Sequence, residues 1–295
     1  MSLLHALARR PTMSVGISIL IAFTLMAVFA SGLEPYSPVA PSGPLFGAPS
    51  SAHWLGTDDA GVDMLSLIIA GSQNSMLVGF AAAIIAVLLG GALGIISGYK
   101  GGWSETGVVA VTDFFLVIPA LPLMIVLAAL FGQSIYQIVL IIGLLSWMSV
   151  TYVVRALVHT LRERGFVARA RSLGAGDRYI IRHHILPHVA PLLVAQTVLT
   201  VAAAVFLEAA LAFVGLGDPS RISWGTLIQT AFDRTAVSAG AWWAIVPPGV
   251  CIALVVLGCF LTGQAVEEAM NPRLGHAHVS HRSFSLRTPT KDDER

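Results

Sequence analysis

Long runs of apolar residues, separated by short polar segments, dominate the pattern of the chain. The first run covers residues 14–33, and about twenty apolar residues are what an α-helix needs to cross a bilayer. Five further runs have a similar length, at residues 74–98, 108–131, 135–158, 192–216 and 242–264. The pattern therefore predicts an all-α, polytopic membrane protein with six transmembrane helices.

The polar segments between these runs predict how the chain is organised. The apolar part of a signal peptide is only about 7–15 residues long, so the first run predicts a retained anchor. The end of the chain is polar and charged, which is typical of disorder. The predicted segments are a head (1–13), a first transmembrane helix (14–33), an external loop (34–73), a five-helix core (74–271) with a cytoplasmic loop at 159–191, and a cytoplasmic tail (272–295).

The composition excludes an ordinary soluble domain. Hydrophobic residues make up 56% of the chain and charged residues 11%, whereas globular proteins carry about 25% charged residues. The two cysteines, Cys251 and Cys259, lie in one apolar run. Two turns apart on a single helix, they are too distant to form a disulfide with each other, and we interpret them as packing residues.

The basic residues are unevenly distributed between the two sides of the predicted membrane. If the amino terminus lies in the cytoplasm, all but two of the 17 Lys and Arg residues fall in cytoplasmic segments, the exceptions being Arg221 and Arg234. Cytoplasmic loops of membrane proteins carry such an excess of Lys and Arg. The distribution predicts that both termini face the cytoplasm.

Small residues and prolines within the runs predict local helix geometry. Gly90, Gly94 and Gly98 form a row on one helix face, a spacing that lets two helices approach closely. We interpret this row as an internal packing face rather than a dimer seam. Pro119 and Pro122 interrupt the third run and predict a kink there.

Two carboxylates lie at or near membrane depth, Asp113 in the third run and Glu208 in the fifth. A charge in the hydrocarbon region is costly, so each side chain must face protein or water. One interpretation makes them part of a translocation path. In the other, they form hydrogen bonds to neighbouring helices or to a partner subunit and fix the packing. The sequence leaves both interpretations open.

The most basic segment, residues 165–191, lies between the fourth and fifth apolar runs. Its pattern predicts two short helices, residues 166–173 and 177–184, separated by a Gly-Ala-Gly turn. The aspartate that opens the second helix is well placed as an N-cap, and Pro187 and Pro191 are expected to end that helix. We therefore expect a structured basic hairpin that faces a partner in the cytoplasm.

Motifs for catalysis and metal binding give weak signals. The chain contains no Walker A phosphate loop, no HExxH zinc signature and no GxSxG nucleophile elbow. His183, His184 and His188 lie close together, but no carboxylate or Cys accompanies them, and we favour a basic surface over a metal site. Residues 215–218 match the GxGD pattern of intramembrane aspartyl proteases. That chemistry needs a second Asp beside the first, and Asp113 is predicted near the opposite side of the membrane.

Several segments together resemble one protein family. Residues 165–187 are similar to the cytoplasmic EAA loop of bacterial ABC importer permeases, with a Gly and a Leu-Pro pair at the family spacing. Residues 53–61 resemble the family's HWLGTD segment, and 271–274 its closing DPRL. Residues 207–217, followed by 223–225, resemble its LEAALSFLGLG…SWG signature. The chain thus resembles the C-type permease subunit of the dipeptide/oligopeptide/nickel branch.

The resemblance implies a type I ABC importer permease fold and a non-catalytic role in the bacterial cell membrane. Such a subunit pairs with a homologous B-type permease and sits on two ATPase subunits or one fused ATPase, while an extracytoplasmic binding protein delivers a peptide or similar small solute. ATP and Mg²⁺ would be bound by the ATPases. The chain itself would hold no cofactor or metal and bind no nucleic acid. The implied ATPase-coupling residues are Ala168, Arg169, Ala170, Arg171, Leu173, Gly174, Ala175, Asp177, Leu186 and Pro187.

The chain departs from the family pattern at two places. Ala168 stands where the family has Glu and Arg169 where it has Ala, so we expect the ATPase partner to present carboxylates there. Val62 stands where the family has Arg, in the turn after the HWLGTD segment. Two other hypotheses are an ATPase-independent secondary carrier or channel and, less favoured, an intramembrane aspartyl protease that uses Asp218.

Overall fold

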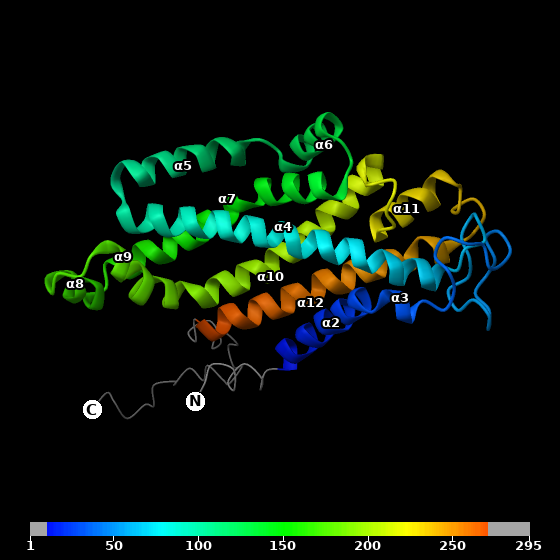
Figure 1. The fold of residues 1–295 in the computed structure, drawn as a ribbon, viewed down its shortest axis with the longest axis horizontal. Coiled ribbons are helices and arrows are strands. Elements are labelled where there is room, and N and C mark those ends of the chain that lie inside the picture. The colour runs from blue at the N-terminus through cyan, green and yellow to red at the C-terminus, as the bar shows by residue number, and fades with distance from the viewer. Residues whose placement is uncertain (1–10, 271–295) are drawn as a thin grey trace, which may run out of the picture.

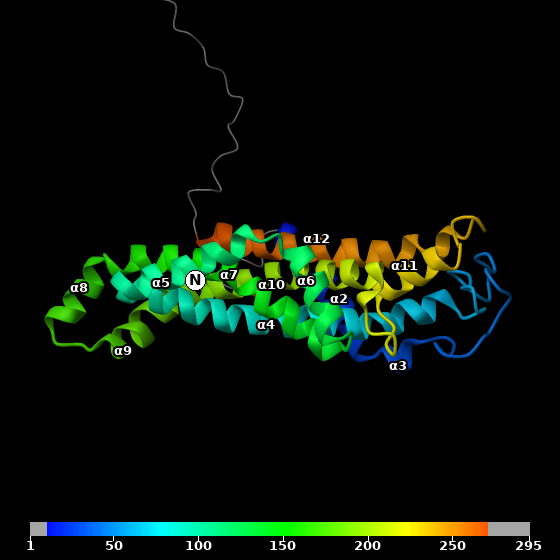
Figure 2. The ribbon, with the colours of Figure 1, turned by 90° about the horizontal axis from the view of Figure 1, so that it is seen from above.

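The structure is a computed structural model that describes residues 11–270. Within this range the chain forms helices and loops, with one isolated bridge between Thr57 and Asp63, so the predicted all-α class is confirmed there. The long helices lie side by side along one axis, and a hairpin of short helices projects at one end (Figure 1, Figure 2). The predicted tail, the segment 271–274 and most of the predicted head lie outside the described residues.

The elements follow one another in the order that the apolar runs predict. They are α2 (Pro11–Val28), α3 (Ala30–Leu33), α4 (Met64–Lys100), α5 (Gly102–Val117), α6 (Ala120–Phe131), α7 (Ile135–Arg162), α8 (Gly165–Ser172), α9 (Asp177–Ile180), η1 (Ile181–Ile185), α10 (Leu186–Leu211), η2 (Ala212–Leu216), α11 (Trp224–Asp233), η3 (Trp242–Ala244) and α12 (Val246–Met270).

Four helical segments are long and apolar enough to cross a membrane. They are α4, α7, the continuous helix Asp177–Leu216 and the helix Trp242–Glu268. The third predicted span corresponds to α5 and α6, which are bent by 85° relative to each other, and α2 is a shorter apolar helix. Four of the six predicted spans are therefore single helices that are long and apolar enough to cross a membrane. The count of six stays a prediction.

The first and last helices of the described chain pack against each other. A Cβ added to Gly16 of α2 would lie 2.6 Å from Thr262 Oγ1 and 2.8 Å from the carbonyl oxygen of Gly258, both in α12. The beginning of α2 and the end of α12 are therefore at the same side of the bundle. A chain that crosses the membrane an even number of times must have both ends on the same side, as seen here. Which side faces the cytoplasm stays a prediction.

The predicted kink in the third span is a complete break. Ile118 has an extended backbone (φ −79°, ψ 125°), as a residue before proline prefers, and α6 begins directly after Pro119. Pro122 lies in the first turn of α6, where its missing N–H leaves no helix bond unmade. The two prolines thus end one helix and start the next in a new direction.

Helix α4 begins at Met64, ten residues before the predicted start of the second apolar run at residue 74, so the predicted end of the external loop at residue 73 is wrong. Asp63 caps the helix, because its Oδ2 accepts a hydrogen bond from the Ser66 backbone N–H at 2.9 Å. Within this extra stretch, the small residues Gly71 and Ser72 are buried inside the bundle. Its 37 residues give a length of about 55 Å, more than the hydrocarbon core alone.

The glycine row of α4 is an internal packing face, as predicted. A Cβ on Gly90 would lie 2.5 Å from the Trp147 carbonyl oxygen of α7, and one on Gly94 would lie 2.8 Å from Val154 Cβ. A Cβ on Gly98 would lie 2.8 Å from the Arg155 carbonyl oxygen. Only glycine allows the two backbones to approach this closely, and α4 and α7 form the central pair of the bundle.

The expectation that Pro187 and Pro191 end a helix is wrong. The helix that starts at Asp177 continues through η1 into α10 and η2, past both prolines, and its helical geometry ends at Gly215, where φ is +85°. η1 is a π-helical turn in which the Leu186 N–H donates to the Ile181 carbonyl oxygen, five residues back. Such a wide turn accommodates proline's ring and its missing N–H without ending the helix.

Candidate functional site

The basic hairpin, which we define as α8, the turn 173–176, α9 and η1, projects from the bundle at the end opposite the loop 34–63 (Figure 1). The first predicted helix of the hairpin, residues 166–173, is confirmed within one residue by α8. The second begins at the predicted Asp177 but runs on into α10.

The inner side of the hairpin is apolar and anchored in the bundle. Val167 of α8 and Ile180 and Ile185 of the second limb are fully buried. They pack with Val158 and Leu161 of α7 in one hydrophobic cluster. Burial of these side chains holds the hairpin against the membrane helices, each contributing about 1.5–3 kcal/mol on full burial.

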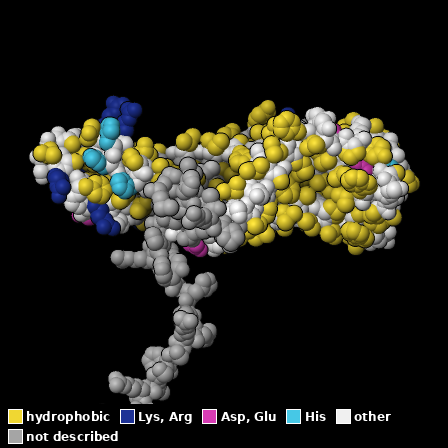
Figure 3. Space-filling view, turned by 90° about the horizontal axis from the view of Figure 1, so that it is seen from below, with side chains coloured by type: hydrophobic (Ala, Val, Ile, Leu, Met, Phe, Trp, Pro, Cys, Tyr) yellow, Lys and Arg dark blue, Asp and Glu magenta, His cyan; other side chains and the backbone are white. Residues whose placement is uncertain are grey.

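The outer side of the hairpin is exposed and carries most of the predicted coupling residues. Leu173 is 83% exposed at its tip. Lys, Arg and His side chains gather over this end of the molecule (Figure 3). Ala170 and Ala175 are half-buried, and the exposed members of the predicted set are Ala168, Arg169, Arg171, Leu173, Gly174, Asp177, Leu186 and Pro187.

Gly174 makes the turn between the two limbs. Its φ is +85°, a conformation that side chains with a Cβ strongly disfavour. The N–H of Gly174 donates to the Arg171 carbonyl oxygen and that of Ala175 to the Ala170 carbonyl oxygen, the pair of bonds of a Schellman C-cap. No atom lies within 4 Å of a Cβ added at Gly174, so the requirement for glycine comes from the backbone alone.

The predicted N-cap role of Asp177 is wrong. Gly176 occupies the N-cap position without a side-chain bond, and Asp177 is the first residue of α9. The Asp177 carboxylate instead accepts a hydrogen bond from the Tyr99 hydroxyl of α4 at 2.8 Å, and Arg171 donates to the same hydroxyl at 3.3 Å. Sequence reasoning missed Tyr99, whose partners lie more than seventy positions away.

The two acids assigned to a path share no hydrogen-bond partner. Asp113 is exposed on α5 and accepts a hydrogen bond from the Tyr152 hydroxyl of α7. Glu208 of α10 is only 4% exposed, and the Ser75 hydroxyl of α4 donates to it at 3.4 Å. Each therefore bonds to a neighbouring helix, and a role in translocation stays a prediction.

The Ser-Trp-Gly segment docks beside Glu208. The Trp224 backbone N–H donates to Ser75 Oγ at 3.1 Å, so that a short chain of hydrogen bonds leads from α11 through α4 to Glu208. The Trp224 indole N–H donates to the Ile68 carbonyl oxygen at 3.0 Å. Gly225 fits against α10, where an added Cβ would lie 2.6 Å from Ala209 Cα. The two halves of the signature thus form one packed junction.

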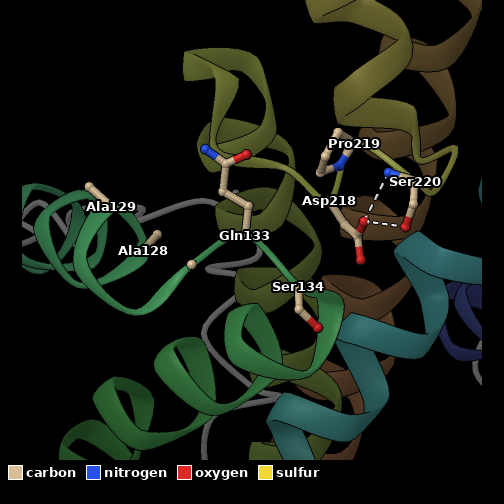
Figure 4. Close-up of a pocket in the computed structure, with 8 residues that line it drawn as sticks. Ala128, Ala129, Gln133, Ser134, Asp218, Pro219 and Ser220 are labelled. Carbon is tan, nitrogen blue, oxygen red and sulfur yellow. Dashed lines mark hydrogen bonds between the residues drawn. The ribbon is translucent and has the colours of Figure 1, made fainter.

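A pocket of about 560 Å³ opens between the α6–α7 connection and the segment after η2, in the half of the molecule away from the hairpin (Figure 1). Asp218 lies in it, and accepts hydrogen bonds from the Ile135 N–H at 3.0 Å and from the backbone and side chain of Ser220 (Figure 4). Burial raises the pKa of the Asp218 carboxyl, but these hydrogen bonds and the nearby Arg221 charge lower it more, so that the pKa lies below its ordinary value. The pocket is lined by Ala128, Ala129, Gly132, Gln133, Ser134, Asp218, Pro219 and Ser220.

The pocket does not supply the chemistry of an aspartyl protease. That chemistry requires two carboxyl groups that share a proton, and Asp218 is the single acid in the lining. A carboxyl group held ionised by several donors is a structural anchor for the start of α7.

His183 and His184 of the hairpin and His188 at the start of α10 contact neighbouring backbone carbonyls or aromatic rings. His183 Nδ1 lies 3.1 Å from the Tyr179 carbonyl oxygen and His188 Nδ1 lies 2.7 Å from that of His184. The His183 ring stacks on Tyr179 and the His188 ring on Phe166. Within the described part of the chain, no group of three or more His, Cys, Asp or Glu residues is arranged to hold a metal ion.

Comparison with known proteins places this arrangement in a family. The family model described as "Binding-protein-dependent transport system inner membrane component" matches residues 90–276, which include the glycine row, the basic hairpin and the Glu208–Trp224 junction. The chain belongs to this family. It is thus the inner-membrane permease component of a transport system that depends on a binding protein, and it has the type I permease fold.

Two curated relatives show how far the likeness extends. The permease is 35% identical over 260 residues to the oligopeptide transport system permease protein OppC of Mycobacterium tuberculosis, covering 86% of this chain and 88% of the relative. It is also 35% identical over 263 residues to the dipeptide transport system permease protein DppC of Alkalihalophilus pseudofirmus, covering 88% and 85%. The likeness therefore spans nearly the whole permease, including the segments before residue 90.

Proposed function

We propose that the permease forms half of the translocation path of an ABC importer for peptides, in which ATP hydrolysis on separate ATPase subunits drives transport. The observation that carries the proposal is the basic hairpin. Its inner side is fixed to the bundle by fully buried residues, while Ala168, Arg169 and the 83% exposed Leu173 leave its outer side open to solvent. A rigid, exposed turn of this kind is suited to a protein partner.

We propose the partners that such a half-path needs for ATP-driven import. A homologous B-type permease would supply the other half, two ATPase subunits or one fused ATPase would bind ATP and Mg²⁺ beneath the hairpins, and an extracytoplasmic binding protein would deliver the solute. The family description names the dependence on a binding protein. Peptides are the proposed cargo because both relatives are named as peptide permeases.

The exposed side chains of the hairpin also suggest which charges the ATPase groove presents. Ala168 can neither accept nor donate a side-chain hydrogen bond, and its neighbour Arg169 is exposed on the same short helix. A guanidinium group binds carboxylates with paired hydrogen bonds. We therefore propose that the groove of the cognate ATPase presents a carboxylate to Arg169.

The adjacent glycines of the turn provide a matched test. Gly174 has φ +85° and Gly176 has φ −72°, and a Cβ at either position meets no atom within 4 Å. Alanine at position 174 therefore strains the turn by about 1–2 kcal/mol, whereas alanine at position 176 does not. The test is to purify tagged wild type, Gly174→Ala and Gly176→Ala in detergent and to measure the copurified ATPase and its activity.

The proposal expects an ATPase and a second permease to copurify with the wild type and with Gly176→Ala. Gly174→Ala should retain less ATPase, or hydrolyse ATP without stimulation by the loaded binding protein. If the wild type purifies without an ATPase and still transports its solute, the protein is an ATPase-independent carrier and the proposal is wrong. If both variants match the wild type, the turn is not part of the coupling surface.

A further inference from the structure

One hydroxyl group joins three helices at the base of the basic hairpin. Tyr99 lies one residue before the end of α4, and it is only 3% exposed. Its hydroxyl donates a hydrogen bond to Asp177 Oδ1 at 2.8 Å and accepts one from Arg171 Nη2 at 3.3 Å. Arg171 belongs to α8 and Asp177 to α9, so both limbs of the hairpin bond to the same atom of α4.

These two bonds differ in kind from the other contacts of the hairpin. Within residues 11–270, they are the only side-chain hydrogen bonds between α8 or α9 and the long helices α4 and α7. Apart from the Arg171 guanidinium over the Tyr99 ring, the remaining contacts there are apolar and centre on Val167 and Ile180. Apolar contact resists separation but has no direction, whereas a hydrogen bond to a charged group requires a defined distance and angle. The Tyr99 hydroxyl therefore fixes where the hairpin lies along the end of α4.

Helix α4 can transmit a movement of the hairpin from Tyr99 to the other end of the bundle. Gly98, the residue before Tyr99, lies against the Arg155 carbonyl oxygen and Val158 of α7. From there α4 runs without interruption to Met64 at the other end of the bundle, where Asp63 caps it. A push on Tyr99 therefore acts on a single rigid element that spans the described molecule.

We propose that Tyr99 is a positioning residue for coupling. Its hydroxyl holds the basic hairpin in one register on α4, so that movement of the hairpin by an ATPase becomes movement of α4 rather than sliding along the apolar contact. The proposal rests on the proposed function, since it requires an ATPase bound at the hairpin. It assigns a transmitting role to a residue that lies outside the hairpin and that touches neither ATP nor solute.

Replacement of Tyr99 by Phe isolates the hydroxyl. Phe keeps the buried ring and its contact with Arg171, whose Cζ lies 5.8 Å from the ring centroid, so assembly of the importer should persist. In proteoliposomes that contain the assembled importer with its binding protein and a labelled peptide, we expect wild-type basal ATP hydrolysis. The peptide transported per ATP hydrolysed should fall by about fivefold or more, the lower end of typical coupling between sites.

Two further variants make the test specific. Tyr136→Phe is the matched control, because Tyr136 is 70% exposed at the far end of α7, and it should keep the wild-type ratio of transport to hydrolysis. Asp177→Ala should lower the ratio as Tyr99→Phe does, and the double variant should lower it no further, because both changes remove the same bond.

The outcomes separate the two proposals. If the wild type couples transport to hydrolysis and Tyr99→Phe does so equally well, the role of Tyr99 is refuted while the proposed function stands. If Tyr99→Phe lowers the amount of assembled importer and leaves the ratio unchanged, Tyr99 serves folding only, and the proposal is again refuted. If the wild type binds no ATPase, both proposals fail together.

Discussion

The two ends of the molecule are built in opposite ways. At the loop end, which comprises residues 34–63 and their contacts, polar groups are buried and satisfied within the chain. Asp63 is 1% exposed and binds His53 at 2.9 Å and both the N–H and the hydroxyl of Ser66. The indole N–H of Trp243 bonds to the Thr57 carbonyl oxygen. At the hairpin end, the buried Tyr99 hydroxyl and the apolar cluster around Val167 hold the inner side of the hairpin. The outer side, which includes Leu173, is exposed.

The comparison shows which end is bonded within the chain and which end is left exposed to a partner. A surface whose polar groups bond inward gains stability and has little left to offer a partner. A surface whose apolar inner side is anchored while its outer side stays exposed offers a stable shape for recognition. We therefore expect mutations at the loop end to change stability, and mutations on the outer side of the hairpin to change association.

The largest effect is expected for Asp63→Asn at the loop end. The change weakens a buried pair with His53 and two hydrogen bonds from Ser66, and should destabilise the protein by about 3 kcal/mol. Thermal unfolding in detergent measures the loss. Asp59→Asn is the control, because Asp59 contacts the exposed Arg234 at 3.5 Å and such surface pairs contribute at most about 1 kcal/mol. Equal effects of the two variants would contradict the account of the loop end.

Leu173→Ala should have the opposite profile. Leu173 is 83% exposed, so the change should alter the free energy of unfolding by no more than about 0.5 kcal/mol, while the ATPase retained by the purified permease should decrease. Val167→Ala, on the buried side of α8 in the same hairpin, should lower stability instead. The comparison between the two ends would lose its basis if Leu173→Ala destabilised the protein as much as Val167→Ala.

The smallest effect concerns the pH dependence of Asp218. Its pKa lies below the ordinary value in the folded protein, so its ionised form favours folding above the unfolded-state pKa of about 3.9. This contribution should be lost as the pH falls through the folded-state pKa, which is lower still. The free energy of unfolding of the wild type should exceed that of Asp218→Asn at neutral pH by less than about 1 kcal/mol, because the group is largely solvated. The difference should shrink below pH 4, and a difference that grew in acid would show that the sign is wrong.

Much of the fold could be predicted because its signals are local. Run lengths locate the four long spans, Pro119 marks the break between α5 and α6, and the glycine row marks the face of α4 that meets α7. The turn at Gly174 also follows from local chemistry, since a positive φ after a short helix favours glycine.

The predictions that failed concern segments whose structure depends on contacts with residues far away in the sequence. Buried Gly71 and Ser72 extend α4 through a segment that looks like a loop, because tertiary packing covers their polar character. Asp177 is a good N-cap by its position, but Tyr99 binds its carboxylate from another helix. The wide turn before Pro187 depends on backbone geometry that no local pattern specifies. Tyr99 itself carries no sequence signal beyond its place after the glycine row.

The most direct test of the central claim is hydrogen–deuterium exchange on the permease alone and on the assembled importer. If the hairpin is the surface that binds an ATPase, backbone amides of residues 165–185 should exchange more slowly after assembly, while those of residues 53–63 at the loop end should be unchanged in the absence of the binding protein. Protection confined to other segments, with the hairpin exchanging as fast in the assembly as alone, would contradict the account.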